Sequence, residues 1–279
     1  MNRLRVSWSL IKASWKVLRQ DKQLAIFSLL SLALYALVLI LLVFGAVAID
    51  SYHFSEKTES WSYFVLGYLF YLALYFVGIF FGSAIVAFVH GRFSGMSPTI
   101  GSGFRMAVGK LPLIAEWAVV AGTVGFILKI IEEKSESAGN IIAAILGGAW
   151  DVATFLIVPL LVLEGKRPLE ALKESAHLLK KTWGEQLIGN VGFTLIFLGL
   201  MLPAVLVVGL GVIIGTKIAM QITIVIAVAY VVALVVAQIT LEGIFRTALY
   251  YYARHASLPH GFSDELLGNA LRSVEDVPL

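Results

Sequence analysis

Residues 149–185 have the sequence AWDVATFLIVPLLVLEGKRPLEALKESAHLLKKTWGE, and this stretch contains each kind of element from which the chain is built. Its first part is apolar except for Asp151, and Pro159 is expected to bend the last turns of a membrane-spanning helix. The charged segment 164–168 marks the exit into water. Residues 169–183 alternate apolar and charged side chains with the period of a helix lying on a membrane surface. The stretch therefore predicts the end of a spanning helix, an exit and a surface helix.

The composition of the whole chain indicates an integral membrane protein. Hydrophobic residues make up 59% without counting glycine, and charged residues only 14%. Soluble domains have roughly 45–50% apolar residues with glycine included, and about 25% charged residues. The sequence contains no cysteine, so disulfides and thiolate metal sites are excluded.

Six apolar runs are long enough to cross a hydrocarbon core of roughly 30 Å. They cover residues 24–49, 61–89, 111–131, 141–163, 187–215 and 218–241. Amphipathic surface helices are expected at 3–22, 98–110 and 168–186. The predicted fold is an all-α polytopic bundle of six transmembrane helices and three cytoplasmic surface helices. It forms one membrane domain over residues 1–255, followed by a cytoplasmic tail over 256–279.

The distribution of basic residues predicts the orientation in the membrane. Of the 21 Lys and Arg, 17 fall on one side of the six spans and only four on the other. The four are Lys57, Lys129, Lys134 and Lys217. Since cytoplasmic segments carry the excess of basic residues, both termini are expected in the cytoplasm of a cell with the protein in its inner or plasma membrane.

The N-terminal helix combines a basic face with an apolar stripe formed by Leu4, Trp8, Ile11, Trp15 and Leu18. At 100° per residue this stripe covers an arc of about 80°, and Lys12, Lys16 and Arg19 lie beside it. A basic helix with tryptophans is typical of the headgroup region of an anionic leaflet. The alternative is a helix packed against its own bundle.

The same 4, 3, 4 spacing of apolar residues occurs twice more, before the second and third pairs of spans. The copies are Ile100, Phe104, Ala107 and Leu111, and then Leu172, Ala176, Leu179 and Trp183. A threefold repeat of surface helix and transmembrane hairpin is one interpretation. Chance is the other, since this spacing is common in amphipathic helices.

Few polar groups lie inside the predicted spans. Glu116 and Lys129 are close enough to the ends of the third span to reach water. Asp151 is 12 residues from Leu163, or about 18 Å along a helix, which places it near the middle of the bilayer. A carboxylate there costs at least about 2.5–3.5 kcal/mol unless it is protonated or paired. It either ties helices together through Thr154 or Asn190, or belongs to a polar pathway.

Two glycine pairs, Gly78 with Gly82 and Gly211 with Gly215, have the small-xxx-small spacing that lets transmembrane helices approach closely. The alternative is chance, because the chain contains 25 glycines.

Several segments resemble a family of uncharacterised prokaryotic multi-pass membrane proteins, known as a domain of unknown function. The resemblance lies in AWDVATF (149–155), Pro159, Glu164, PLEALKESAHLLKKTWGE (168–185), Gly189-Asn190 and FRTALYYYARH (245–255). A looser likeness extends to the membrane domain attached to some glycerophosphodiester phosphodiesterases. The resemblance implies a helical membrane fold and carries no assigned activity.

No catalytic constellation, metal site or cofactor site is found in the sequence. Two classes of function are therefore expected. The first is a non-enzymatic membrane-organising or partner-binding protein, whose partners are anionic lipid headgroups and either a second copy or another membrane protein. The second is a small transporter or channel that uses Asp151. No nucleic-acid partner is expected.

Overall fold

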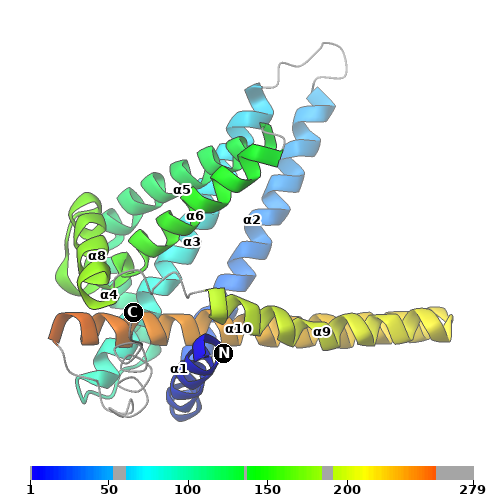
Figure 1. Cartoon of the computed structure of the whole chain (residues 1–279). Coiled ribbons are helices and arrows are strands. Elements are labelled where there is room, and N and C mark those ends of the chain that lie inside the picture. The colour runs from blue at the N-terminus through cyan, green and yellow to red at the C-terminus, as the bar shows by residue number, and fades with distance from the viewer. Residues whose placement is uncertain (1, 53–60, 135–136, 184–190, 256–279) are drawn as a thin grey trace. The chain divides into compact units, whose positions relative to one another are not determined.

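A computed structural model describes residues 2–52, 61–134, 137–183 and 191–255 (Figure 1). Within these ranges every regular element is a helix, and there is no strand. The predicted all-α class is confirmed. The predicted tail after residue 255 lies outside the described residues.

Six helical segments are long and apolar enough to cross a membrane, as the sequence predicts. Five are continuous helices, and the fourth combines a longer helix with two short segments. The continuous ones are α2 (Leu24–Tyr52), α3 (Trp61–Phe93), α5 (Leu111–Lys134), α9 (Val191–Ile214) and α10 (Lys217–His255). At 1.5 Å per residue, the 39 residues of α10 extend about 58 Å, so it continues well past a core of roughly 30 Å.

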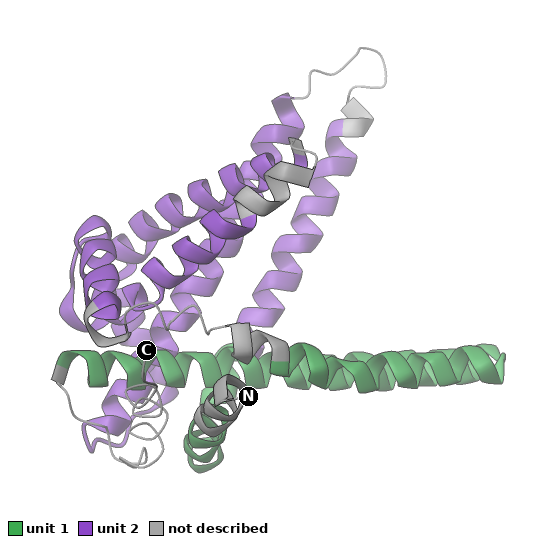
Figure 2. Ribbon diagram, in the orientation of Figure 1, with its two compact units in different colours: residues 1–28, 185–279 green, residues 29–184 purple. Residues whose placement is uncertain are grey.

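Two compact units divide the described chain (Figure 2). Unit 1 contains residues 1–28 and 185–279, and unit 2 contains residues 29–184. The first turn of α2 therefore belongs to unit 1 and the rest of that helix to unit 2. The single membrane domain over residues 1–255 stays a prediction.

Unit 1 is built on the hairpin of α9 and α10, which run side by side (Figure 1). The turn between them uses Gly215 at φ 73°, a conformation that favours glycine. Helix α1 (Asn2–Gln20) packs against α10 and also contacts α9. The first turn of α2 is tied to α10 by a hydrogen bond of 2.7 Å between the buried hydroxyls of Ser28 and Thr240.

Unit 2 is organised around α3, which packs against both α5 and the short helix α4 (Ile100–Gly109). A capping box between Thr99 and Ser102 begins α4. Phe104 then packs its ring against Phe80 and Phe81 of α3, at centroid distances of 6.1 and 5.8 Å. One face of α4 is therefore fixed on α3.

The fourth span is interrupted. Helix α6 (Ser137–Thr154) ends before Phe155, and the chain resumes as α7 (Ile157–Pro159) and the π-helix η1 (Leu160–Glu164). The break lies one turn before Pro159, because proline has no N–H to donate to the carbonyl four residues earlier and its ring clashes with that carbonyl. The sequence predicted a bend in the last turns, and the structure shows a break of two residues, Phe155 and Leu156.

The exit and the following helix begin where the sequence places them. Gly165, at φ 68°, ends the π-helix, and α8 (Pro168–Trp183) has a proline at its first position. The buried side of α8 consists of Ala171, Ser175, Leu178 and Leu179, whereas Ala176 is exposed. The predicted stripe through Leu172 and Ala176 is therefore rotated away from the observed one. That α1, α4 and α8 lie on a membrane surface stays a prediction.

Candidate functional site

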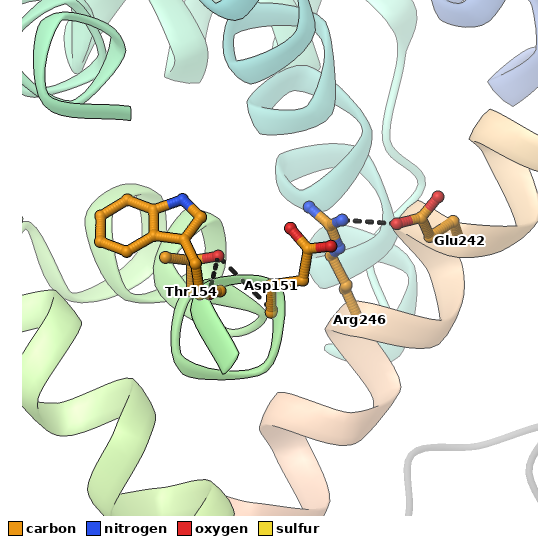
Figure 3. A network of polar contacts seen from close by, with 5 residues as sticks. Asp151, Thr154, Glu242 and Arg246 are labelled. Carbon is orange, nitrogen blue, oxygen red and sulfur yellow. Dashed lines mark hydrogen bonds and ion pairs between the residues drawn. The ribbon is translucent and has the colours of Figure 1, made fainter. Parts of the chain in front are cut away.

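The last turn of α6 carries Asp151 and Thr154, directly before the break in the fourth span (Figure 3). Asp151 is an exposed residue, and Thr154 is half-buried. The Thr154 hydroxyl donates to the backbone carbonyl of Trp150 at 2.8 Å and lies 3.4 Å from that of Asp151. Its proton is therefore used within its own helix, and the tie through Thr154 stays a prediction.

Helices α5 and α3 lie near this turn. Trp150 stacks on Trp117 of α5 at a centroid distance of 5.7 Å. Asp151 lies close enough to Tyr75 of α3 for its charge to act on that side chain. The Tyr75 hydroxyl in turn lies over Gly125 of α5, where an added Cβ would come within 2.4 Å of the oxygen. Gly125 therefore makes the room in which this phenol sits.

The hydroxyls of two further tyrosines lie where helices of unit 2 meet. Tyr68 of α3 and Thr123 of α5 form a hydrogen bond of 2.9 Å. The hydroxyl of Tyr35 on α2 lies over Gly78 of α3, 2.5 Å from the position of an added Cβ. These contacts were not predicted, because a tyrosine in an apolar run is counted with the aromatic residues and its partner helix is not known from the sequence.

Glu116 and Lys129 lie toward the two ends of α5. Glu116 is exposed near the start of α5. Lys129, near its other end, forms ion pairs with Glu132 at 3.1 Å and Glu133 at 3.6 Å on the following turn. Asn190 lies outside the described residues, so its predicted tie to Asp151 stays a prediction.

A second group of predicted residues lies on α1. Lys12, Lys16 and Arg19 are all exposed. Trp15 is also exposed, at 46%, and does not share the buried face of Ile11 and Leu18. Ser14 and Val17 lie on that buried side instead, and the apolar stripe at a membrane interface stays a prediction. The side chain of Trp8 lies outside the described part of the chain.

A polar cluster at the exit of the fourth span was not predicted. Lys166 forms ion pairs with Glu164 at 3.2 Å and with Glu174 of α8 at 3.4 Å. At the break itself, the backbone N–H of Leu156 donates to the hydroxyl of Ser175 on α8 at 3.1 Å. The charge-rich segment 164–174 could have indicated the ion pairs, but no sequence rule identifies which serine accepts the hydrogen bond from Leu156.

The described residues contain no group of three or more His, Asp or Glu side chains placed to hold a metal ion. Among the charged groups of unit 1, Glu242 and Arg246 form an ion pair one turn apart on α10 (Figure 3). This pair lies where α10 continues past the predicted end of its span at Leu241. An i, i+4 pair of this kind supports the helix itself.

Residues 61–259 match a family of unknown function, DUF6159. The match covers more than half of the chain. The chain belongs to this family. Membership agrees with the resemblance to an uncharacterised membrane-protein family, and it brings no catalytic residue to the DUF6159 chain. No curated protein matches the sequence. The looser likeness to the phosphodiesterase-associated membrane domain receives no support from these comparisons.

Proposed function

We propose that this DUF6159 protein is a non-enzymatic membrane-organising protein of the cell membrane that binds an anionic cytoplasmic leaflet through α1. Its membership of a family of unknown function and its six apolar helices establish a multi-pass membrane protein of unknown activity. The observation that carries the finer proposal is the outward position of Trp15 among the basic residues of α1.

The two faces of α1 have different chemistry. Ile11, Val17 and Leu18 are buried, and α1 packs against α10 and α9. At 100° per residue, the exposed positions 12, 15, 16 and 19 fall within an arc of about 100°. A tryptophan on this face suits the membrane interface, where its ring lies among headgroups and its N–H finds a polar partner. Packing on the hairpin and contact with lipid therefore use different sides of one helix.

The charges on this face favour an anionic surface. Each Lys or Arg near such a leaflet contributes roughly 1 kcal/mol, so Lys12, Lys16 and Arg19 together contribute about 3 kcal/mol. This attraction falls as salt rises, because the Debye length shortens from about 10 Å at 0.1 M to about 3 Å at 1 M.

A single-cysteine probe tests the proposal in the full chain, which has no native cysteine. A fluorophore at Gln20→Cys, an exposed position, should be quenched by headgroup-level nitroxide lipids in nanodiscs containing anionic lipid. Combining Lys12→Gln, Lys16→Gln and Arg19→Gln should reduce that quenching. Raising the salt concentration should have a similar effect.

The matched control removes the same charge from α8 and from Arg167, which directly precedes it. Arg167, Lys173 and Lys180 are exposed, and replacing all three by glutamine should leave the α1 probe quenched. Equal quenching in neutral and anionic nanodiscs, or no effect of the α1 triple variant, would contradict the lipid-binding proposal and leave α1 as a packing helix alone.

A second candidate function is transport of protons or small cations. It is favoured by the position of Asp151 one turn before a break in a spanning helix, because discontinuous helices form the ion sites of many transporters. In proteoliposomes, Asp151→Asn should then fold normally and abolish proton or cation flux, since it keeps the shape and loses the charge. A wild-type protein that passes neither ion would remove this candidate.

A further inference from the structure

The break in the fourth span leaves a backbone donor that must find a partner. Leu156 has φ −95° and ψ 7°, outside the helical range, and the Phe155 N–H turns back to the carbonyl of Val152 at 3.1 Å. Leu156 is fully buried, so water does not reach its N–H. Broken transmembrane helices persist only where a neighbouring group satisfies the freed backbone.

Ser175 of α8 provides that group. Its hydroxyl accepts from the Leu156 N–H at 3.1 Å, 19 residues away in sequence. Ser175 is itself fully buried, between Ala171 and Leu178 on the side of α8 that faces the protein. The acceptor reaches the break only while α8 is docked.

The segment after the break is poorly able to hold its own conformation. It consists of the three residues of α7 and the five of η1, and a π-helix has wider and weaker turns than an α-helix. Its main contacts within unit 2 are with α3 and α8. Its orientation therefore depends on packing against those helices.

An ionic clasp joins the other end of this segment to α8. Lys166 Nζ lies between a carboxylate oxygen of Glu164, the last residue of η1, and one of Glu174, next to Ser175. The Lys166 side chain is only 25% exposed, which limits screening by water. Helix α8 thus holds segment 157–164 at both ends, through Ser175 near its beginning and through Lys166 at its end.

We propose that the Phe155–Leu156 break is a hinge in the fourth span and that α8 is its latch. When α8 undocks, Leu156 loses its acceptor and segment 157–164 is released to reorient relative to α6. The device connects a helix outside the span to the turn that carries Asp151 and Thr154. It depends on neither of the functions proposed above, since it rests on contacts inside unit 2.

Hydrogen exchange of the full-length protein in nanodiscs tests the latch. In Ser175→Ala, amides 156–164 should exchange on the order of 10-fold faster, because a buried donor loses its partner. The first turns of α6 should be unchanged. The matched control is Ser83→Ala, which removes an equally buried hydroxyl that bonds only to the Ile79 carbonyl of its own helix. It should not alter exchange in 156–164.

The outcomes distinguish a latch that holds the whole segment 157–164 from a hydrogen bond that protects only the Leu156 amide. Faster exchange confined to the Leu156 amide, or no change at all, would overturn the proposal. Ser175→Thr keeps the acceptor oxygen and should exchange more slowly than Ser175→Ala. If the two variants behave alike, the hydrogen bond is not what holds the hinge.

A second experiment does not depend on whether the serine variants fold. Lys166→Met keeps the apolar stem and removes the clasp, so exchange in 157–164 should rise several-fold. In the wild type 1 M salt should produce part of that rise, and in Lys166→Met it should add nothing. A wild type and a methionine variant with the same exchange and the same salt response would refute the clasp and, with it, the latch.

Discussion

Helices α9 and α10 pack closely at Gly211, and adding one methyl group there should force the two helices apart. A Cβ at this position would come within 2.1 Å of Thr223 Oγ1, 3.2 Å of Thr223 Cβ and 3.3 Å of Met220 Cα. The Thr223 hydroxyl is held by the carbonyls of Ala219 at 2.9 Å and Met220 at 3.1 Å, so it does not simply turn away. Overpacking of this kind costs about 1–3 kcal/mol.

The expected net effect of Gly211→Ala is smaller than that cost, because alanine is better than glycine in a helix by roughly 1 kcal/mol. We expect a destabilisation of about 0–2 kcal/mol, measured by reversible unfolding in mixed micelles. Gly209→Ala is the matched control on the same helix, because nothing lies within 4 Å of a Cβ there. It should be neutral or stabilising.

Removing the obstructing oxygen should relieve the strain. In the double variant with Thr223→Ala, the closest remaining contacts of the new methyl group are those at 3.2 and 3.3 Å, which small shifts accommodate. The two substitutions should therefore be less destabilising together than the sum of each alone, by about 1 kcal/mol. Equal effects of Gly211→Ala and Gly209→Ala, or strict additivity with Thr223→Ala, would refute the close packing.

Three further predictions concern topology and polar ties. A reporter active only outside the cytoplasm should give signal when inserted at Ser55, which lies outside the described residues, and none at the C-terminus; the reverse would contradict the orientation inferred from the basic residues. Asp151→Leu should destabilise by about 0.6–2 kcal/mol if Asp151 ties helices, whereas Asp151→Asn should leave thermal stability unchanged. Tyr68→Phe should cost about 0.6 kcal/mol through loss of the Thr123 bond, and Tyr71→Phe, which keeps that bond, should cost less in the same assay.

The spans were predictable because a bilayer imposes a simple requirement on sequence. A helix that crosses it needs about 20 largely apolar residues, and the chain has six such runs separated by polar segments. The helices extend past the predicted spans where they continue into polar sequence: α5 by three residues, to Lys134, and α10 by 14 residues, to His255. Hydropathy reports where lipid begins, and backbone hydrogen bonding decides where a helix ends.

The buried faces of the short helices were harder to predict. Apolar spacing selected Trp15 on α1 and Ala176 on α8, but the structure buries Ser14 and Ser175 instead. Small residues allow close approach of another helix, and a serine contributes a hydroxyl as well. On α1 and α8, the face chosen by hydrophobicity alone therefore differs from the buried face, because a serine is buried on each helix.

The glycine pairs show the same limit of sequence reasoning. Gly78 and Gly211 lie under side chains of neighbouring helices, as the small-xxx-small spacing predicts, whereas Gly82 has nothing within 4 Å of an added Cβ. Gly215 ends α9 at a positive φ and serves the turn. Spacing identifies candidates for close approach, but the position of the second helix decides which member of each pair is used.

Pro159 predicts where the fourth span is disrupted, but it does not predict which group stabilises the disrupted backbone. Its lack of an N–H and its ring predict disruption within the preceding turn, and the structure breaks at Phe155 and Leu156. The proline does not determine how the freed donor of Leu156 is satisfied. The acceptor is on a helix that begins only after the chain has left the span, so it follows from the docking of α8 and not from the local sequence. The fourth span and α8 should therefore be treated as one folding unit, in which a substitution on α8 alters the stability of the backbone at the break.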